Sequence, residues 1–285
     1  RLRLYNLSGY STLSGVSILI TGAASGIGKA LAQHLFLNEN ANLLLADINL
    51  QGLDELKAEL QKQRNQGSIK IFEVDISSET SVQMLVSGLK DSSIDILINN
   101  AGIVGVGTFE STPINDLQRI IDVNLMGTIR LTHAILPFVL QSKKPSIITI
   151  TSAAGYVAAP GLSAYSASKF GLTGFMDSLR AELKGRAQVC TVSPAFIRTD
   201  LAQNATNKDA DPAKQKMDQF LQEKGDDPIT VVRSVVKALK KNRKRVLVNG
   251  QAKFLYYLNK FAPWLSTIFI NLMYNALKKE GIISE

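Results

Sequence analysis

Short apolar runs alternate with amphipathic stretches along most of this chain of 285 residues. Continuous apolar runs predict buried strands, here at residues 16–20, 42–47, 69–74, 94–98, 146–151, 187–192 and 245–248. Apolar residues recurring every three or four positions predict helices, here at residues 29–37, 78–89, 117–140 (broken late by Pro137), 163–184 and 229–239. This alternation predicts an α/β fold, a doubly wound parallel sheet of about seven strands with helices on both faces and right-handed crossovers.

A glycine-rich turn joins the first predicted strand to the first helix, with Gly22, Gly26 and Gly28 in the run 21–28. Glycines at such a turn let the backbone approach a pyrophosphate, which the N-terminus of the following helix can bind. A glycine triplet alone also fits an ordinary tight turn. However, Asp47 ends the second strand nineteen residues after Gly28, where a carboxylate can accept hydrogen bonds from an adenosine ribose. The pattern indicates a dinucleotide site.

Later in the chain, three residues have side chains that can transfer a proton at a carbon–oxygen bond. Tyr165 and Lys169 are four positions apart, one helical turn, so they share a face. An ammonium near a phenol favours the phenolate, which predicts a lowered pKa for Tyr165. Ser152 ends a strand thirteen residues before Tyr165 and could hold the same substrate oxygen. The three residues predict general acid–base catalysis on an alcohol or carbonyl.

Together with other motifs, these residues make the chain resemble the short-chain dehydrogenase/reductase (SDR) family over about residues 12–200. The resemblance rests on the glycine-rich turn, the run Asn-Asn-Ala-Gly at 99–102, an asparagine at 124, the serine, tyrosine and lysine above, and residues 194–199. It implies a Rossmann-type catalytic domain, residues 1–250, with the catalytic tetrad Asn124, Ser152, Tyr165 and Lys169. It also implies a cofactor site formed by Gly22, Ser25, Gly26, Ile27, Gly28, Asp47, Asp75, Ile76, Asn100, Ala101, Gly102, Tyr165, Lys169, Pro194, Ile197 and Thr199.

Some residues allow two interpretations. Asp75 fits a cap of the next helix or, by the resemblance, an adenine contact shared with the Ile76 backbone. Asn124 fits a solvated helix residue or a tetrad member that bends its helix to hold a water near Lys169. Ala195 departs from the family, which usually has glycine after this proline. We expect an ordinary backbone at Ala195 and no loss of activity.

Together, the cofactor site and the tetrad predict hydride transfer between a nicotinamide cofactor and a secondary alcohol or ketone. Tyr165 would exchange the proton, Ser152 would orient the oxygen, Lys169 would hold the nicotinamide ribose, and Asn124 would complete a relay through water. The direction of the reaction stays open.

The expected cofactor is NAD rather than NADP. A 2′-phosphate would be repelled by Asp47, and the positions where a compensating cation is expected are Ser25 and Ile48. Lys29, in the first turn of the helix, fits a contact with solvent or with the pyrophosphate.

Composition bears on partners and location. The net charge of +8 suits an anionic surface, and without a nucleic-acid motif we expect no nucleic-acid partner. Cys190 is expected to be a buried thiol, and because it is the single cysteine it can form no intrachain disulfide, which favours a cytoplasmic location. His34 and His133 have no Cys or acid pair at metal spacing, so no metal site is expected. The chain begins at Arg1 without a visible signal peptide, and a removed anchor stays open.

Residues 251–285 are expected to form an amphipathic helical extension broken at Pro263. The 17 uncharged residues between Lys260 and Lys278 are at the short limit for a membrane span. Peripheral contact with the cytosolic face of a membrane is the favoured interpretation, with Trp264 and nearby tyrosines at the interface. The alternative is a helix pair that covers the substrate pocket or contacts a dimer partner.

Residues 196–227 are expected to form a variable substrate lid. A helix is predicted from Pro212, with Asp211 as its cap. Its apolar side, which faces either a ligand or the core, carries Met217, Phe220 and Leu221. An apolar lid and extension predict a small lipophilic alcohol or ketone, and sterol, retinoid and long-chain acyl compounds stay open.

The resemblance also implies assembly. The helices at 117–140 and 163–184 are expected to pair across a two-fold axis into a homodimer or homotetramer, with a contact surface that includes Phe170, Leu172 and Phe175. Two function classes stay open: an active dehydrogenase, and a catalytically silent NAD-binding regulatory or scaffold protein of the same fold. The complete tetrad favours the first.

Overall fold

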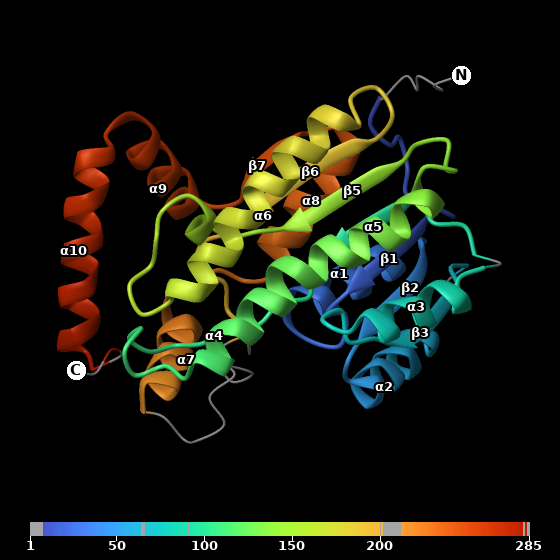
Figure 1. Ribbon diagram of the computed structural model, residues 1–285. Helices are drawn as coiled ribbons and strands as arrows, with labels where there is room; N and C mark the ends of the chain where they lie inside the picture. The colour runs from blue at the N-terminus through green and yellow to red at the C-terminus, as the bar shows by residue number, and fades with distance from the viewer. Residues whose placement is uncertain are drawn as a thin grey trace.

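The computed structural model describes residues 8–63, 66–90, 92–199, 201, 212–281 and 283. Its centre is a seven-stranded sheet of order β3-β2-β1-β4-β5-β6-β7, parallel throughout (Figure 1). The strands are β1 (Ser17–Thr21), β2 (Asn42–Asp47), β3 (Ile69–Glu73), β4 (Ile96–Asn99), β5 (Ser146–Ile150), β6 (Gln188–Ser193) and β7 (Arg245–Leu247). The predicted doubly wound fold is confirmed.

Helices cover both faces of the sheet because each buried strand carries apolar side chains on both sides. In β1, Ile18 and Ile20 pack with α1 (Gly26–Leu37), α2 (Leu50–Gln61) and α8 (Ile229–Lys240). Leu19 faces the other way, into the cluster formed with α3 (Glu79–Gly88), α5 (Thr128–Val139) and α6 (Ser163–Glu182). These two apolar layers fix the strand ends from which the candidate site is built.

The predicted helical run over 117–140 is confirmed, but its predicted break at Pro137 is wrong. The helix starts earlier, as α4 (Ile114–Ile121), continues through a π-helical segment, η1 (Asp122–Gly127), and becomes α5. Pro137 lies inside α5. A proline in the last turn removes only a bond near the helix end, where the helix can tolerate it. The irregularity instead surrounds Asn124.

One helix was not predicted. In α2, Asn49 caps the N-terminus by accepting a hydrogen bond from the amide of Gly52 at 3.0 Å. Leu53, Leu56 and Leu60 are its buried face. Their helical spacing was available in the sequence. A short 3₁₀ turn, η2 (Ala153–Gly155), follows β5.

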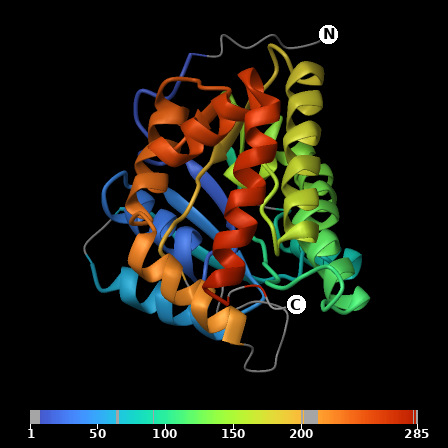
Figure 2. The ribbon, with the colours of Figure 1, turned by 90° about the vertical axis from the view of Figure 1, so that its left-hand side faces the viewer.

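The carboxyl-terminal extension forms two helices, α9 (Gly250–Phe261) and α10 (Pro263–Lys279), with the predicted break at Pro263. They lie at the edge of the molecule away from β3, and α10 crosses the front of the view in Figure 2. The lid helix α7 (Pro212–Lys224) starts at the predicted residue. Asp211, its predicted cap, lies outside the described residues. No helix among the described residues is long and apolar enough to cross a membrane.

Candidate active site

The strand order reverses between β1 and β4, and a cavity of about 970 Å³ lies at the carboxyl ends of these strands. Such a switch point is where doubly wound sheets bind ligands. The predicted site residues that line it are Gly22, Ser25, Gly26, Ile27, Asp47, Asp75, Ile76, Asn100, Ala101, Gly102, Ser152, Tyr165, Lys169, Pro194, Ile197 and Thr199. Gly28 and Asn124 are buried and are not part of the lining.

The glycine-rich turn is held by close backbone packing. Gly22 and Gly26 have φ of +64° and +50°, a region that side chains with a Cβ disfavour. A Cβ on Gly28 would lie 1.9 Å from the carbonyl oxygen of Gly22, so this glycine permits packing of the turn rather than ligand contact. Asn100 Nδ2 donates to the carbonyl oxygens of Thr21 and Gly22 at 3.0 and 3.1 Å. Asn100 therefore fastens the turn to the end of β4.

Asp47 lies at the end of β2 and lines the same part of the cavity. Its Oδ2 accepts from the amide of Ala24 at 2.9 Å and its Oδ1 accepts from the amide of Asn49 at 2.9 Å. The two bonds hold the carboxylate beside the glycine-rich turn, and each oxygen keeps further acceptor capacity. Lys29 forms an ion pair with Glu59 at 3.7 Å and does not line the cavity.

Asp75 does not cap the helix that follows it. Its Oδ1 accepts from both the amide and the hydroxyl of Ser77, at 2.8 and 2.6 Å, while Ser78 caps α3. Asp75 and Ile76 both line the cavity. The position therefore fits the predicted adenine contact, which stays a prediction.

The loop after β6 closes the opposite side of the cavity. The Pro194 carbonyl oxygen accepts from the amide of Ala153 at 2.7 Å, which ties this loop to the segment after Ser152. Ala195 is not among the described residues with positive φ, as expected. Ile197 is buried and bridges to Asp226, so the loop is anchored on both sides.

Ser152, Tyr165 and Lys169 meet in the centre of the cavity. Ser152 follows β5, and Tyr165 and Lys169 lie in the first turns of α6. Tyr165 and Ser152 share a side-chain hydrogen bond. Lys169 Nζ lies 5.4 Å from the centroid of the Tyr165 ring and donates to the carbonyl oxygen of Ile150 at 3.4 Å. The side chains of these three residues therefore converge, one from the end of β5 and two from α6.

Burial dominates the electrostatics of this trio. Desolvation lowers the pKa of the buried Lys169 to about 8. Desolvation raises the pKa of Tyr165, and the hydrogen bond with Ser152 only partly opposes this shift. The predicted net lowering of the Tyr165 pKa is therefore wrong for this structure, because loss of solvent around the phenolate outweighs the groups that favour it. Tyr165 is a neutral phenol that can donate a proton.

Asn124 acts from behind the cavity wall. It lies in the π-helical segment and is fully buried. Its Oδ1 accepts from the amide of Ile103 at 2.8 Å, and its Nδ2 donates to the Ile103 carbonyl at 2.9 Å and to Ser168 Oγ at 3.1 Å. A Cβ on Gly102 would lie 3.1 Å from Asn124 Oδ1 and 3.6 Å from Lys169 Nζ. The solvated-helix interpretation is wrong, and Asn124 joins the loop after β4 to the catalytic helix.

The substrate end of the cavity is formed by the lid and the extension. Met217 and Leu221 of α7, Leu255 of α9 and Met273 of α10 all line it. Phe220 instead packs edge-to-face against Phe196, at a centroid distance of 5.0 Å. Both interpretations of the lid helix are thus partly right, since it packs against neighbours and also faces the cavity.

Sequence reasoning missed a polar strip on α4 and η1. The strip also lines the cavity and consists of Asn115, Gln118, Arg119 and Asp122. These positions follow the i, i+3, i+4, i+7 spacing of one helix face. That spacing was the signal available in the sequence.

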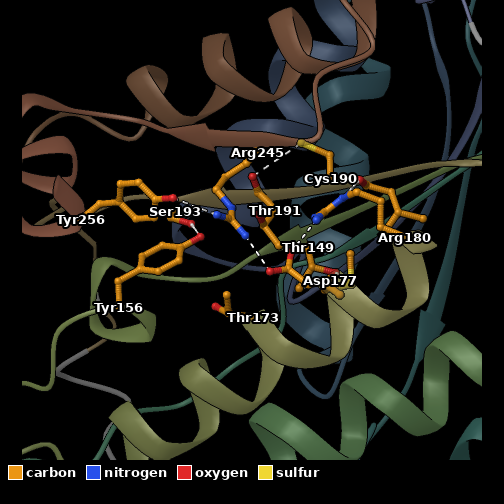
Figure 3. A network of polar contacts seen from close by, with 12 residues as sticks. Thr149, Tyr156, Thr173, Asp177, Arg180, Cys190, Thr191, Ser193, Arg245 and Tyr256 are labelled. Carbon is orange, nitrogen blue, oxygen red and sulfur yellow. Dashed lines mark hydrogen bonds and ion pairs between the residues drawn. The ribbon is translucent and has the colours of Figure 1, made fainter. Parts of the chain in front are cut away.

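A polar network connects the extension to the catalytic elements (Figure 3). Arg245 of β7 donates to Tyr256 of α9 at 3.1 Å and to Asp177 of α6 at 2.6 Å. Its guanidinium also lies 5.6 Å from the centroid of the Tyr156 ring. Ser193 donates to the Tyr156 hydroxyl at 3.3 Å. The network therefore holds α9 against both α6 and the segment that follows Ser152.

No group of three or more His, Cys, Asp or Glu within reach of a common metal ion occurs in the described part of the chain. Cys190 is buried in β6, as predicted, and burial raises the pKa of its thiol to about 12. The thiol is therefore inert at neutral pH.

Known proteins are similar to this chain in sequence and in fold. The short chain dehydrogenase family model matches residues 17–210. Dehydrogenase/reductase SDR family member 7B of Xenopus tropicalis is 34% identical over 286 residues, covering 97% of this chain and 90% of that protein. A putative oxidoreductase, SadH, of Mycobacterium tuberculosis is 33% identical over 250 residues, covering 85% and 89% of the two chains.

Solved structures agree at the level of the fold. A short chain dehydrogenase/reductase from Burkholderia phymatum in complex with NAD superposes with a TM-score of 0.81 at 22% identity, covering 90% of this chain and 96% of that chain. A short chain dehydrogenase from Burkholderia cenocepacia in complex with NADP gives 0.74 at 24% identity, covering 91% and 98%. With the family model matched over most of the chain, the protein belongs to the short-chain dehydrogenase/reductase family of oxidoreductases.

Proposed function

We propose that this oxidoreductase transfers a hydride between NAD(H) and a secondary alcohol or ketone, using Tyr165, Lys169, Ser152 and Asn124. The observation that carries the proposal is the single cavity that extends from the glycine-rich turn to the hydrogen-bonded pair Tyr165 and Ser152. A bound dinucleotide would occupy both ends, with its phosphates at the glycine-rich turn and its nicotinamide near Tyr165. The nicotinamide would supply the hydride acceptor or donor.

The chain's own groups provide the proton chemistry. In ketone reduction, the neutral phenol of Tyr165 donates a proton to the substrate oxygen, and Ser152 orients that oxygen. Lys169, with its pKa lowered to about 8, is still largely protonated at neutral pH. Its charge favours the phenolate that Tyr165 becomes after donating. Asn124 positions the Ile103 backbone and Ser168 next to this group.

The proposed cofactor is NAD rather than NADP. Asp47 is held at the cavity wall by two backbone amides, where a 2′-phosphate would meet its negative charge. Arg119 and Lys169 are the basic residues among the described lining residues. They lie on α4 and α6, whereas Asp47 ends β2. Lys29 is paired with Glu59 and would not neutralise the phosphate.

The proposed substrate is lipophilic. The walls at the substrate end are apolar side chains from three separate segments, namely Val157, Leu162, Met217, Leu221, Leu255 and Met273. An apolar pocket favours a substrate with a large hydrocarbon part, because each buried CH₂ contributes about 0.8 kcal/mol to the binding free energy. A sterol, a retinoid and a long-chain acyl compound all meet this description.

We also propose a homo-oligomer built on α6. Phe170 is 43% exposed, and the other exposed positions on its face of α6 are small, at Ser163, Ala167, Gly174 and Ser178. Small residues let a partner helix approach closely. Leu172 is 1% exposed and packs inside the protomer, so its predicted place on the contact surface is wrong, and Phe175 is partly buried against the core.

The decisive experiment is turnover of a panel of lipophilic ketones with NADH and of the corresponding secondary alcohols with NAD. Wild-type protein is expected to convert at least one of them. Tyr165→Phe is expected to bind NADH normally and to lose about 10²–10⁴-fold in kcat. Tyr10→Phe is the matched control, because it removes a buried tyrosine hydroxyl that is not part of the cavity lining. NADH binding without turnover of any substrate would favour the silent regulatory protein of the same fold.

A further inference from the structure

We propose that helices α9 and α10 dock on an anionic lipid bilayer and admit a lipid substrate from it. Large apolar side chains cover the outer side of these helices and are between 38% and 74% exposed. This outer face consists of Phe254, Tyr257, Phe261, Trp264, Leu265, Ile268, Leu272 and Tyr274. Soluble monomers seldom expose so many neighbouring large apolar residues without a binding role.

The outer face belongs to one structural unit. Phe254 of α9 and Phe269 of α10 pack edge-to-face at a centroid distance of 6.0 Å, which joins the two helices. Tyr257 and Phe261 stack at 6.0 Å with an interplanar angle of 8°. Figure 2 shows α10 lying across the outside of the molecule, where nothing else in the described chain covers it. The two helices therefore form one packed unit on the outside of the molecule.

Charge identifies the partner as an anionic surface. Residues 228–279 contain 11 Lys and Arg residues and no Asp or Glu. Four of them, Lys253, Lys260, Lys278 and Lys279, belong to α9 and α10, so the helix pair carries positive charges only. Within the helix pair, Lys253, Lys260 and Lys279 are exposed. Aromatic and apolar groups flanked by lysines are the composition of an interfacial helix on anionic lipid.

The helices have the dimensions to lie on a bilayer. Helix α10 has 17 residues, and no described helix can cross a membrane. Its N-terminus carries Trp264, a residue that favours the headgroup region. Ser266 is buried towards the protein while its neighbours Leu265 and Ile268 are exposed, so the helix has distinct inner and outer sides. This arrangement fits shallow insertion of the outer side.

The inner side of the same helices lines the catalytic cavity. Leu255 follows Phe254 and Met273 follows Leu272, and both inner residues line the cavity. Leu277 of α10 packs against the cluster of Val106, Ala213 and Met217, next to the lid helix. A lipid leaving the bilayer at this helix pair would therefore reach the substrate end without crossing bulk water. The entry step rests on the proposed dehydrogenase function, whereas bilayer docking does not.

Co-sedimentation of the full chain with phosphatidylserine–phosphatidylcholine vesicles tests the docking step. We expect wild-type protein to sediment at low salt, to bind less as salt screens the lysines within about 8–10 Å, and to retain an apolar, salt-resistant fraction. Phe261→Ser/Trp264→Ser should weaken the partition by about tenfold or more. Leu37→Ser/Met84→Ser is the matched control, since these residues are also exposed but lie on α1 and α3. The control should bind like wild type.

A second pair of variants tests the charge contribution. Lys253→Gln/Lys279→Gln should lower binding to phosphatidylserine vesicles and leave the weak binding to pure phosphatidylcholine unchanged. Lys62→Gln/Lys90→Gln removes the same charge from exposed positions elsewhere and should have less effect on either. Equal losses in both pairs would show that overall charge, and not this face, drives binding.

The entry step is tested with two substrates of the same reacting group. The Phe261→Ser/Trp264→Ser variant should lose turnover of a long-chain substrate embedded in vesicles and keep turnover of a short, water-soluble analogue. Loss of both would indicate damage to the catalytic site. Wild-type protein that stays in the supernatant at low salt would overturn the proposal. If, in addition, the aromatic variant lowers the mass in sedimentation velocity, the face is a contact between two copies of this chain.

Discussion

Arg245 donates to Asp177 at 2.6 Å, and this ion pair joins the last strand of the sheet to the helix that carries Tyr165 and Lys169. Arg245 also donates to Tyr256, so the same guanidinium reaches the extension. Asp177 is at the same time paired with Arg180. One carboxylate and one guanidinium thus connect α6 with β7 and α9, two consecutive elements that come much later in the sequence.

Replacing this guanidinium should loosen the extension. Arg245→Met is expected to lower the free energy of unfolding by about 1–3 kcal/mol, because two charge-assisted hydrogen bonds are lost and Asp177 keeps only Arg180. Hydrogen exchange should rise in α9 more than in α1. Lys240→Met is the control, since its partly exposed pair with Glu39 should contribute only about 0–1 kcal/mol. Unchanged exchange in α9 would show that the network does not hold the helix.

Gly28 should tolerate no side chain. The Cβ of Gly28→Ala would lie 1.9 Å from the Gly22 carbonyl oxygen, so the glycine-rich turn must move. We expect a loss of stability of about 1–3 kcal/mol and weaker NADH binding. Gly250→Ala, where a Cβ meets nothing within 4 Å, should change stability by less than about 1 kcal/mol. NADH titration and urea unfolding of both variants check this, and normal binding by the Gly28 variant would contradict it.

Lys169 should make stability depend on pH. Its pKa is about 8 in the folded protein and 10.5 without burial, so between these values only the unfolded chain binds the proton. The penalty for burying Lys169 is therefore full below about pH 8 and disappears as the pH rises towards about 10.5. Lys169→Met should be more stable than wild type at neutral pH, by at most about 3 kcal/mol. Its advantage should shrink towards about pH 10 in urea unfolding. A stability difference between the two proteins that does not change with pH would refute the low pKa of Lys169. The tyrosine and cysteine residues titrate in both proteins, so their contributions cancel when the two stabilities are subtracted.

Asp47 should decide the cofactor. Asp47→Ser/Ile48→Arg removes the repulsion of a 2′-phosphate and adds a cation at an exposed position of the cavity wall. The ratio of kcat/KM for NADPH over NADH should rise by about tenfold or more. Asp54→Ser removes an exposed charge from α2 and should leave the ratio unchanged. A wild-type enzyme that already prefers NADPH would refute the charge argument.

Phe170 should contribute to assembly. Phe170→Glu places a charge on the exposed face of α6, and we expect it to convert the oligomer to monomer in sedimentation velocity at micromolar concentration. Met84→Glu places the same charge on the exposed surface of α3 and should leave the mass unchanged. A wild-type monomer at this concentration would refute the assembly itself.

The order of the strands, most of the helices and most of the predicted site residues that line the cavity could be predicted from the sequence alone. Apolar runs and helical spacing are local properties. They locate the strand before the glycine-rich turn, the strand that ends at Asp47, and the helix that carries Tyr165 and Lys169. The π-helical segment inside the predicted helix 117–140 was missed because it leaves the apolar spacing almost unchanged. The place of Leu172 was mispredicted because a single helix does not show which of its apolar sides meets the sheet.

Only the tertiary structure decided what surrounds each group. The pKa of Tyr165 is raised by burial among segments that are distant in the sequence, and this effect outweighs the opposing hydrogen bond with Ser152. Asn124 and Gly28 lie behind the cavity wall. Asn124 bonds to the backbone of Ile103, and Gly28 packs against the carbonyl oxygen of Gly22. Likewise, only the packed chain shows that Leu255 and Met273 face the cavity while Phe254 and Leu272, one residue away, face outwards. A side chain's surroundings are set by packing between segments, whereas its chemistry and its secondary structure are set largely by its neighbours in the sequence.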